Sequence, residues 1–191
     1  MKEEYIKRYY KEIKRDLPKF PDEIIDAWIL DFAKDIGWPP GNPMLDPEKR
    51  WGAILRSKDL EYWAKIKWQK EKQTLAPKDF VYEDQKSITG LILTNVFGVP
   101  NIYSLTMSDT KERFDRICEY MKTNGSFPGT VAIVDIENKY LIADGCHRLA
   151  AYFYLLGYLK GTTPEMICLN VTEEQEYWVG RSEIEKDNSA E

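Results

Sequence analysis

The fold of this chain depends on residues 140–156, which read YLIADGCHRLAAYFYLL. The first four of these residues are aromatic or apolar, which predicts a short buried strand. Asp144 and Gly145 predict a turn, because glycine permits tight backbone conformations and the close approach of a ligand. Asp144 is also the predicted N-cap of a following helix, since its carboxylate can accept a hydrogen bond from a free N–H of the first turn.

A helix is predicted to begin at Cys146. Its apolar side chains share one face, and they are Leu149, Ala150, Phe153 and Leu156. Gly157 stands where a C′ glycine would end the helix. The stretch therefore predicts a strand, a tight turn and a helix, in that order.

The predicted helix start combines groups that suit an anion. A helix N-terminus has unpaired N–H groups and partial positive charge, and Arg148 adds a cation whose forked donors fit phosphate. His147, the one histidine of the chain, can donate a hydrogen bond or move a proton. Cys146 is expected to form a thiolate readily, and Asp144 could act as a general base. Residues 144–148 therefore predict a site for a phosphate-bearing ligand; the alternative is a purely structural role in capping, packing and surface ion pairing.

The run Asp144 to Arg148, followed by Leu-Ala-Ala-Tyr152, resembles the signature loop of the ParB/sulfiredoxin superfamily. Sulfiredoxins carry Gly-Cys-His-Arg at this turn, and the free-serine kinases of the superfamily carry Asp-Gly-X-His-Arg. The resemblance covers roughly residues 98–172. It implies that Gly145, Cys146, His147 and Arg148 hold nucleotide phosphates, with Asp144, His147 and Cys146 as catalytic candidates. The DNA-segregation members use Gly-Glu-Arg-Arg instead, and this chain departs from that form.

Composition sets limits on the class of protein. Of the 191 residues 43% are hydrophobic and 13% aromatic, which is enough for a sizeable core. No apolar run approaches the ~20 residues of a membrane helix, and the N-terminus lacks the apolar segment of a signal peptide. We therefore expect a cytoplasmic protein with no membrane partner. The three cysteines have neither metal nor disulfide spacing, so no metal site is expected.

The negative charge is concentrated at one end of the chain. The net charge is -5, and residues 173–191 carry seven acidic and two basic side chains, so the preceding residues balance. An acidic tail is predicted there. The balance argues against a dedicated nucleic-acid binder, which is normally basic.

The first 75 residues are predicted to be all-helical. Helices are expected over residues 4–16, from Pro21 to Ile36, from Asp46-Pro47, and from Asp59 to Lys72. Residues 76–97 are predicted to be a connector, in which 87–96 could be a strand or a short helix. Residues 173–191 form the predicted tail.

Residues 98–172 are predicted to form the ParB/sulfiredoxin-like domain. Strands are expected at 101–107, 130–136, 139–143 and 165–171, with a hairpin turn at Glu137-Asn138. Ser108 is expected to cap a helix over 109–122 that places Cys118 in the core. The predicted fold class is therefore α+β: a small mixed sheet with helices, preceded by an all-helical region.

These features favour an enzyme that transfers a phosphoryl group between ATP or ADP and an unknown acceptor. Mg²⁺ would bridge the nucleotide phosphates, although no carboxylate cluster identifies protein ligands for it. One alternative is a ParB-like DNA-associated nucleotide-binding or nuclease module. A second is a sulfinic-acid reductase with Cys146 as nucleophile, and a third is a scaffold that retains only the fold. The sequence leaves the acceptor, the preferred nucleotide and the oligomeric state open.

Overall fold

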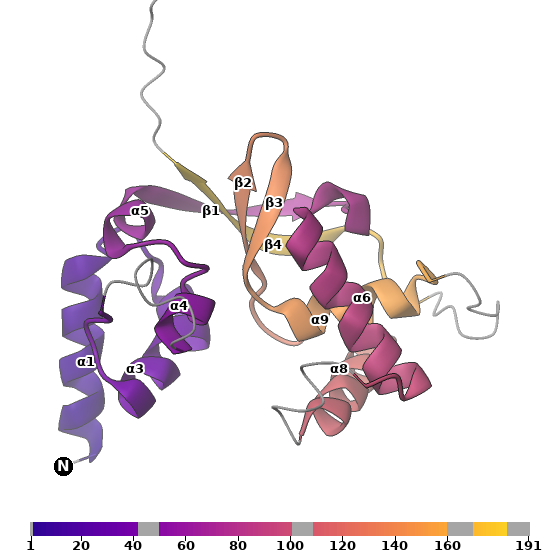
Figure 1. Ribbon diagram of the computed structural model, residues 1–191, viewed down its shortest axis with the longest axis horizontal. Helices are drawn as coiled ribbons and strands as arrows, with labels where there is room; N and C mark the ends of the chain where they lie inside the picture. Colours follow the sequence, from indigo (N-terminus) through magenta and orange to yellow (C-terminus); the bar gives the residue numbers. More distant parts are fainter. Residues whose placement is uncertain (1, 42–49, 101–108, 160–169, 183–191) are drawn as a thin grey trace, which may run out of the picture. The chain divides into compact units, whose positions relative to one another are not determined.

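The computed structural model describes residues 2–41, 50–100, 109–159 and 170–182. The described residues combine helices with a four-stranded sheet of order β1-β4-β2-β3 (Figure 1). Its strands are β1 Ile66–Gln73, β2 Ala132–Ile136, β3 Lys139–Asp144 and β4 Gln175–Ser182. The predicted α+β class is confirmed. The chain divides into two compact units, Met1–Gln69 with Gly180–Glu191, and Lys70–Val179.

Short helices form most of the first unit. They are α1 Lys2–Asp16, α2 Asp22–Ile24, a π-helical turn at Ile25–Ile29, α3 Leu30–Ile36, α4 Arg50–Ile54 and α5 Leu60–Lys65. The first two predicted helices are confirmed, the second with a π-helical turn in its middle. The helix start predicted at Asp46-Pro47 lies outside the described residues. An aromatic cluster fills the interior, in which Trp28 and Trp63 meet edge to face with ring centroids 5.0 Å apart.

The helix that was expected to reach Lys72 ends at Lys65. Its C-cap, Ile66, already has extended backbone angles, and Ile66–Gln73 form β1. The physical reason is pairing with β4, which the local sequence does not reveal. Gly180 of β4 permits the close approach, because a Cβ there would lie 2.6 Å from Ile66 Cγ2 and 3.0 Å from the Trp68 ring.

Two other segments differ from the predictions. Most of the expected connector is the helix α6, Tyr82–Phe97, which follows a 3₁₀ turn at Pro77–Asp79. Most of the described part of the expected tail is the strand β4. The short helix that the sequence allowed over 87–96 lies within α6, but the full helix and β4 were not predicted, because non-local contacts stabilise them rather than strong local patterns. Phe80 forms a parallel bridge with Tyr140 of β3.

Residues at the start of α6 form hydrogen bonds with the backbone groups on the outer edge of β3. Val81 N donates to Tyr140 O over 2.9 Å, and Ile142 N donates to the Asp84 carboxylate over 2.7 Å. Asp84 is completely buried. Because β3 ends the strand order of the sheet, these bonds replace the partners that a further strand would supply.

The β2–β3 hairpin positions the signature stretch. The strands are antiparallel, with Ile136 opposite Lys139. The predicted two-residue turn is confirmed: Glu137 has φ 47° and Asn138 has φ 71°. Positive φ at both central residues matches the turn to the twist of the strands. The predicted strands 130–136 and 139–143 are observed as β2 and β3, within a few residues at their ends.

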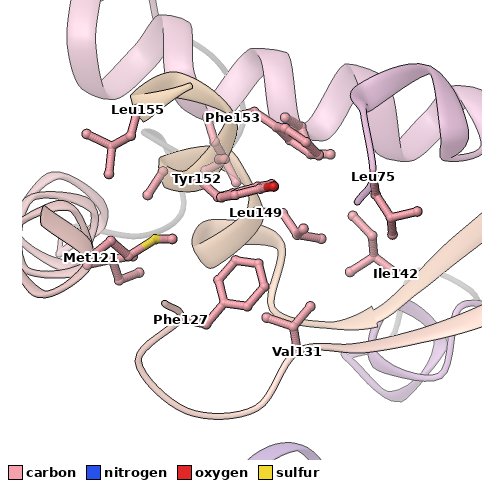
Figure 2. Packing of buried hydrophobic residues seen from close by; sticks show 14 of the residues in the cluster. Leu75, Met121, Phe127, Val131, Ile142, Leu149, Tyr152, Phe153 and Leu155 are labelled. Atoms are coloured by element: carbon pink, nitrogen blue, oxygen red, sulfur yellow. The ribbon is translucent and has the colours of Figure 1, made fainter. Parts of the chain in front are cut away.

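Helix α9, Cys146–Leu155, forms the centre of the second unit. It packs against α6 and against α8, Thr110–Asn124. Figure 2 shows side chains from α9 among side chains of α8, the strands and the loops between them, and the labelled ones are Leu75, Met121, Phe127, Val131, Ile142, Leu149, Tyr152, Phe153 and Leu155. Cys118 lies in this core as predicted, and burial raises the pKa of its thiol to about 12. Gly157 follows α9 with φ 75°, which confirms the predicted helix end.

Other predictions lie outside the described residues. These are the strand 101–107, the capping residue Ser108, and most of the strand 165–171, with Cys168 in it. The described end of that last segment, residues 170 and 171, is not in a strand. Within the described ranges no helix has the length and apolar character to cross a membrane.

Candidate anion-binding site

The tight turn between β3 and α9 places the five predicted site residues. Asp144 is the last residue of β3, where it pairs with Ala132. Gly145 then turns the chain with φ 102° and is itself the N-cap of α9. The prediction that Asp144 caps the helix is wrong. Because Asp144 is still part of the strand, its carboxylate reaches Arg148 instead, and Arg148 Nη2 donates to Asp144 Oδ2 over 2.5 Å.

Glycine is strongly favoured at position 145. A Cβ there would lie 3.0 Å from Val131 Cγ2 and 3.3 Å from Arg148 Nε. The φ of 102° is also one that other residues rarely adopt. The glycine therefore fixes the start of α9 and, through it, the position of the Arg148 side chain.

A pocket of about 330 Å³ opens at this turn. All five predicted residues line it, and three further residues complete the described lining: Arg113, Ile117 and Pro128. Its volume lies near the lower end of the ~300–1,000 Å³ typical of small-molecule sites. The structure thus brings the predicted residues together around one cavity.

Sequence reasoning missed Arg113, Ile117 and Pro128 as site residues. Arg113 precedes Ile117 by four positions, so both lie on one side of α8. Ile117 is buried on α8, and Arg113 is half-buried one turn before it. This spacing was the available signal, but it becomes informative only when the packing of α8 against α9 is known.

Two guanidinium groups supply the positive charge of the pocket. Arg148 comes from the first turn of α9, and its side chain is 22% exposed. Arg113 comes from α8 and pairs with Asp109 over 3.0 Å. Both side chains therefore combine an acidic partner with a position on the pocket lining.

His147 is neutral near pH 7. Burial, together with the positive charges of Arg113 and Arg148, lowers the pKa of its imidazole to about 4. A neutral imidazole can donate one hydrogen bond and accept another or a proton. His147 is thus a polar contact or a proton carrier in this pocket, and the arginines are its cations.

Asp144 is a stronger base than an ordinary aspartate. Burial raises the pKa of its carboxyl group, and the charges of Arg148 and Arg113 and the N–H of Gly145 oppose that rise in part. A carboxylate of this kind accepts a proton more readily than an exposed one. It faces the same cavity as the two guanidinium groups.

Cys146 is the first residue of α9 and also lines the pocket. It is partly buried against the hydrophobic core and is not in a disulfide. It differs in this from Cys118, which lies fully in the core. Cys146 can therefore meet a ligand in the pocket.

No set of three His, Cys, Asp or Glu side chains that could hold a metal ion is present among the described residues. Comparisons of the chain with models of protein families, with curated proteins and with solved structures found no match.

Proposed function

We propose that this protein is a nucleotide-dependent phosphoryl-transfer enzyme whose phosphates bind in the pocket at residues 144–148. The observation that supports this most is the composition of the pocket lining. Arginines from two different helices, the N-terminus of α9, a neutral imidazole and a half-buried carboxylate line one cavity. The free N–H groups and partial positive charge of a helix N-terminus, together with arginine, attract anions. The likeness of residues 144–148 to the ParB/sulfiredoxin signature supports a nucleotide as the ligand.

Each residue has a distinct role in this proposal. The backbone N–H groups of Gly145 and Cys146, together with Arg148, bind phosphate oxygens. His147 donates a hydrogen bond to the ligand. Asp144 accepts the proton of an acceptor hydroxyl as general base, for which its raised pKa suits it.

Mg²⁺ would be bound chiefly by the phosphates of ATP or ADP. Asp144 is the carboxylate among the described residues of the pocket lining and would be the protein group available to help hold the ion. The ion would neutralise charge on the transferring phosphoryl group. Cytoplasmic location, where such nucleotides are abundant, is part of the same proposal.

A thermal-shift panel tests this function. ATP, ADP, CTP and GTP, each with Mg²⁺, are added to the wild type, to Arg148→Ala and to the control Arg116→Ala. Arg116 lies on α8 with an exposed side chain that pairs with Glu112. We expect at least one nucleotide to raise the midpoint of thermal unfolding of the wild type and the control by mass action. The same nucleotide should not raise the midpoint of Arg148→Ala. Equal shifts in all three proteins, or none in the wild type, would contradict the proposal.

The position of Cys146 supports a second candidate function. A thiol beside a phosphate site is what a sulfinic-acid reductase of the sulfiredoxin type requires, with Cys146 as nucleophile. Cys146→Ser and Asp144→Asn separate the two reactions. Phosphotransfer through Asp144 predicts retained turnover in Cys146→Ser and strongly reduced turnover in Asp144→Asn. Thiol chemistry predicts loss of turnover in Cys146→Ser with ATP binding intact.

A further inference from the structure

We propose that Arg113 is the second arm of a polyphosphate clamp, so that the pocket selects ligands with at least two adjacent phosphate groups. This inference rests on the proposed function, because it assumes that residues 144–148 bind phosphate. It adds a specificity-determining residue outside the signature stretch. It also names the ligand class as diphosphates and triphosphates rather than single phosphates.

The two arginines reach the pocket from separate helices. Arg148 extends from the first turn of α9 and Arg113 from the first turn of α8, and both line the same cavity. Their charges act on common neighbours, since both disfavour protonation of His147 and both favour the ionised form of Asp144. Two guanidinium groups around one cavity can each bind a different phosphate of a chain.

The ion pairs of the two arginines favour a ligand that carries separate negative charges. Arg148 is bound to Asp144 over 2.5 Å and Arg113 to Asp109 over 3.0 Å. Each guanidinium is thus balanced by one carboxylate, and a ligand gains most where it brings a negative charge to each. His147 cannot replace either cation, because it is neutral near pH 7.

Arg148 retains a donor for the ligand while it binds Asp144. Its Nε is buried and makes no hydrogen bond within the described part of the chain. A phosphate oxygen there would satisfy a donor that is otherwise desolvated and unpaired. The phosphate bound by Arg148 and the start of α9 would then place the next phosphate toward Arg113.

Calorimetric titration with inorganic ions tests the clamp. Orthophosphate and pyrophosphate are titrated into the wild type, Arg113→Ala and the control Arg116→Ala. We expect the wild type and the control to prefer pyrophosphate. Loss of one charged hydrogen-bonding partner should weaken pyrophosphate binding in Arg113→Ala by about 10- to 100-fold, with little change for orthophosphate.

Asp109→Asn distinguishes ligand binding from a structural role of the Arg113–Asp109 pair. If Arg113 served only to pair with Asp109, the two variants would weaken binding alike. The clamp predicts opposite effects, because Asp109→Asn removes the competing carboxylate and should tighten pyrophosphate binding. Asparagine is also a favoured N-cap, so this variant carries the test even if Arg113→Ala fails to fold.

AMP and ADP identify the source of the phosphates. A nucleoside diphosphate ligand predicts that ADP binds more tightly than both AMP and pyrophosphate, and an inorganic polyphosphate predicts no gain from the nucleoside; either result supports the clamp. Equal binding of orthophosphate and pyrophosphate, or an unchanged preference in Arg113→Ala, would overturn the clamp while the phosphate site stands. Absence of binding by every ion and nucleotide would overturn the proposed function as well.

Discussion

Arg148 lies four residues after Asp144 and donates a hydrogen bond to its carboxylate over 2.5 Å. The residue predicted to bind phosphate and the predicted general base therefore form an ion pair with each other. Neither side chain is fully exposed, at 22% and 25%. A phosphate bound at Arg148 Nε would place negative charge beside the Asp144 carboxylate while the ion pair stays in place. That charge would favour proton uptake by Asp144 when the nucleotide is bound.

Asp144→Asn is expected to separate binding from catalysis. The amide no longer competes as a charge for Arg148, so nucleotide affinity should be maintained or increased. Turnover should fall by about 10²- to 10⁴-fold, which is the usual contribution of a general base. Calorimetry and a steady-state assay measure the two quantities. Weaker binding with unchanged turnover would show that Asp144 serves only to orient Arg148.

Gly145→Ala is expected to destabilise the protein and to weaken anion binding together. The new Cβ would crowd Val131 and Arg148 Nε at a backbone conformation that alanine disfavours. We expect a loss of about 2 kcal/mol or more in the free energy of unfolding, since backbone strain of this kind alone costs about 1–3 kcal/mol.

Gly98→Ala is the matched control for that variant. Gly98 also has positive φ, 68°, but a Cβ there would meet nothing within 4 Å. Urea denaturation of both variants isolates the effect of crowding. Equal losses of stability would mean that crowding of the added Cβ at position 145 against Val131 and Arg148 does not contribute to the loss.

Stability is expected to fall as the pH decreases from about 6.5 toward 4. The pKa of His147 is about 4 in the folded chain and 6.5 by default in the unfolded chain. Between these values the unfolded chain binds a proton that the folded chain does not, so acid favours unfolding. The loss should approach about 3 kcal/mol at the lower end of this window.

His147→Gln should remove that component of the pH dependence. Because His147 is the only histidine, the difference between the two proteins reports this group alone. Urea unfolding at pH 7, 5.5 and 4.5 measures it. Parallel pH profiles for wild type and variant would mean that His147 is not buried as a neutral imidazole.

Asp84→Ala is expected to be among the most destabilising single substitutions in α6. It leaves the buried N–H of Ile142 without the acceptor that now lies 2.7 Å away. A buried unsatisfied donor costs about 1–3 kcal/mol, and more when its partner was charged. Glu83→Ala, at an exposed neighbouring position, is the control. Thermal unfolding that shows equal effects at the two positions would contradict a role for Asp84 at the sheet edge.

Local patterns were sufficient to predict the hairpin and α9. The turn at Glu137-Asn138, the apolar strands around it and the C′ glycine at 157 act over a few residues, and the structure follows them. Tertiary pairing decided the elements that were missed. Lys-rich β1 and β4 become strands because they pair, and α6 covers an edge that the sequence did not reveal.

The candidate site was predictable only in part. Residues 144–148 line one pocket as expected, because glycine at the turn and the helix start are local features. The partner of Asp144 was mispredicted, since capping and an ion pair four residues away compete for the same carboxylate, and the strand extends one residue further than expected. Arg113 was missed because its part in the site depends on how two helices pack.

The single imidazole of the chain offers the most direct test of the phosphate site. In a proton NMR titration of wild type and Arg148→Ala with ATP and Mg²⁺, His147 needs no assignment by mutagenesis. A bound polyphosphate should shift its ring resonances saturably and raise its pKa from about 4, because negative charge stabilises the imidazolium. Arg148→Ala should show no such shift at the same nucleotide concentration. His147 ring resonances that do not shift on addition of the nucleotide to the wild type would contradict a phosphate site at residues 144–148.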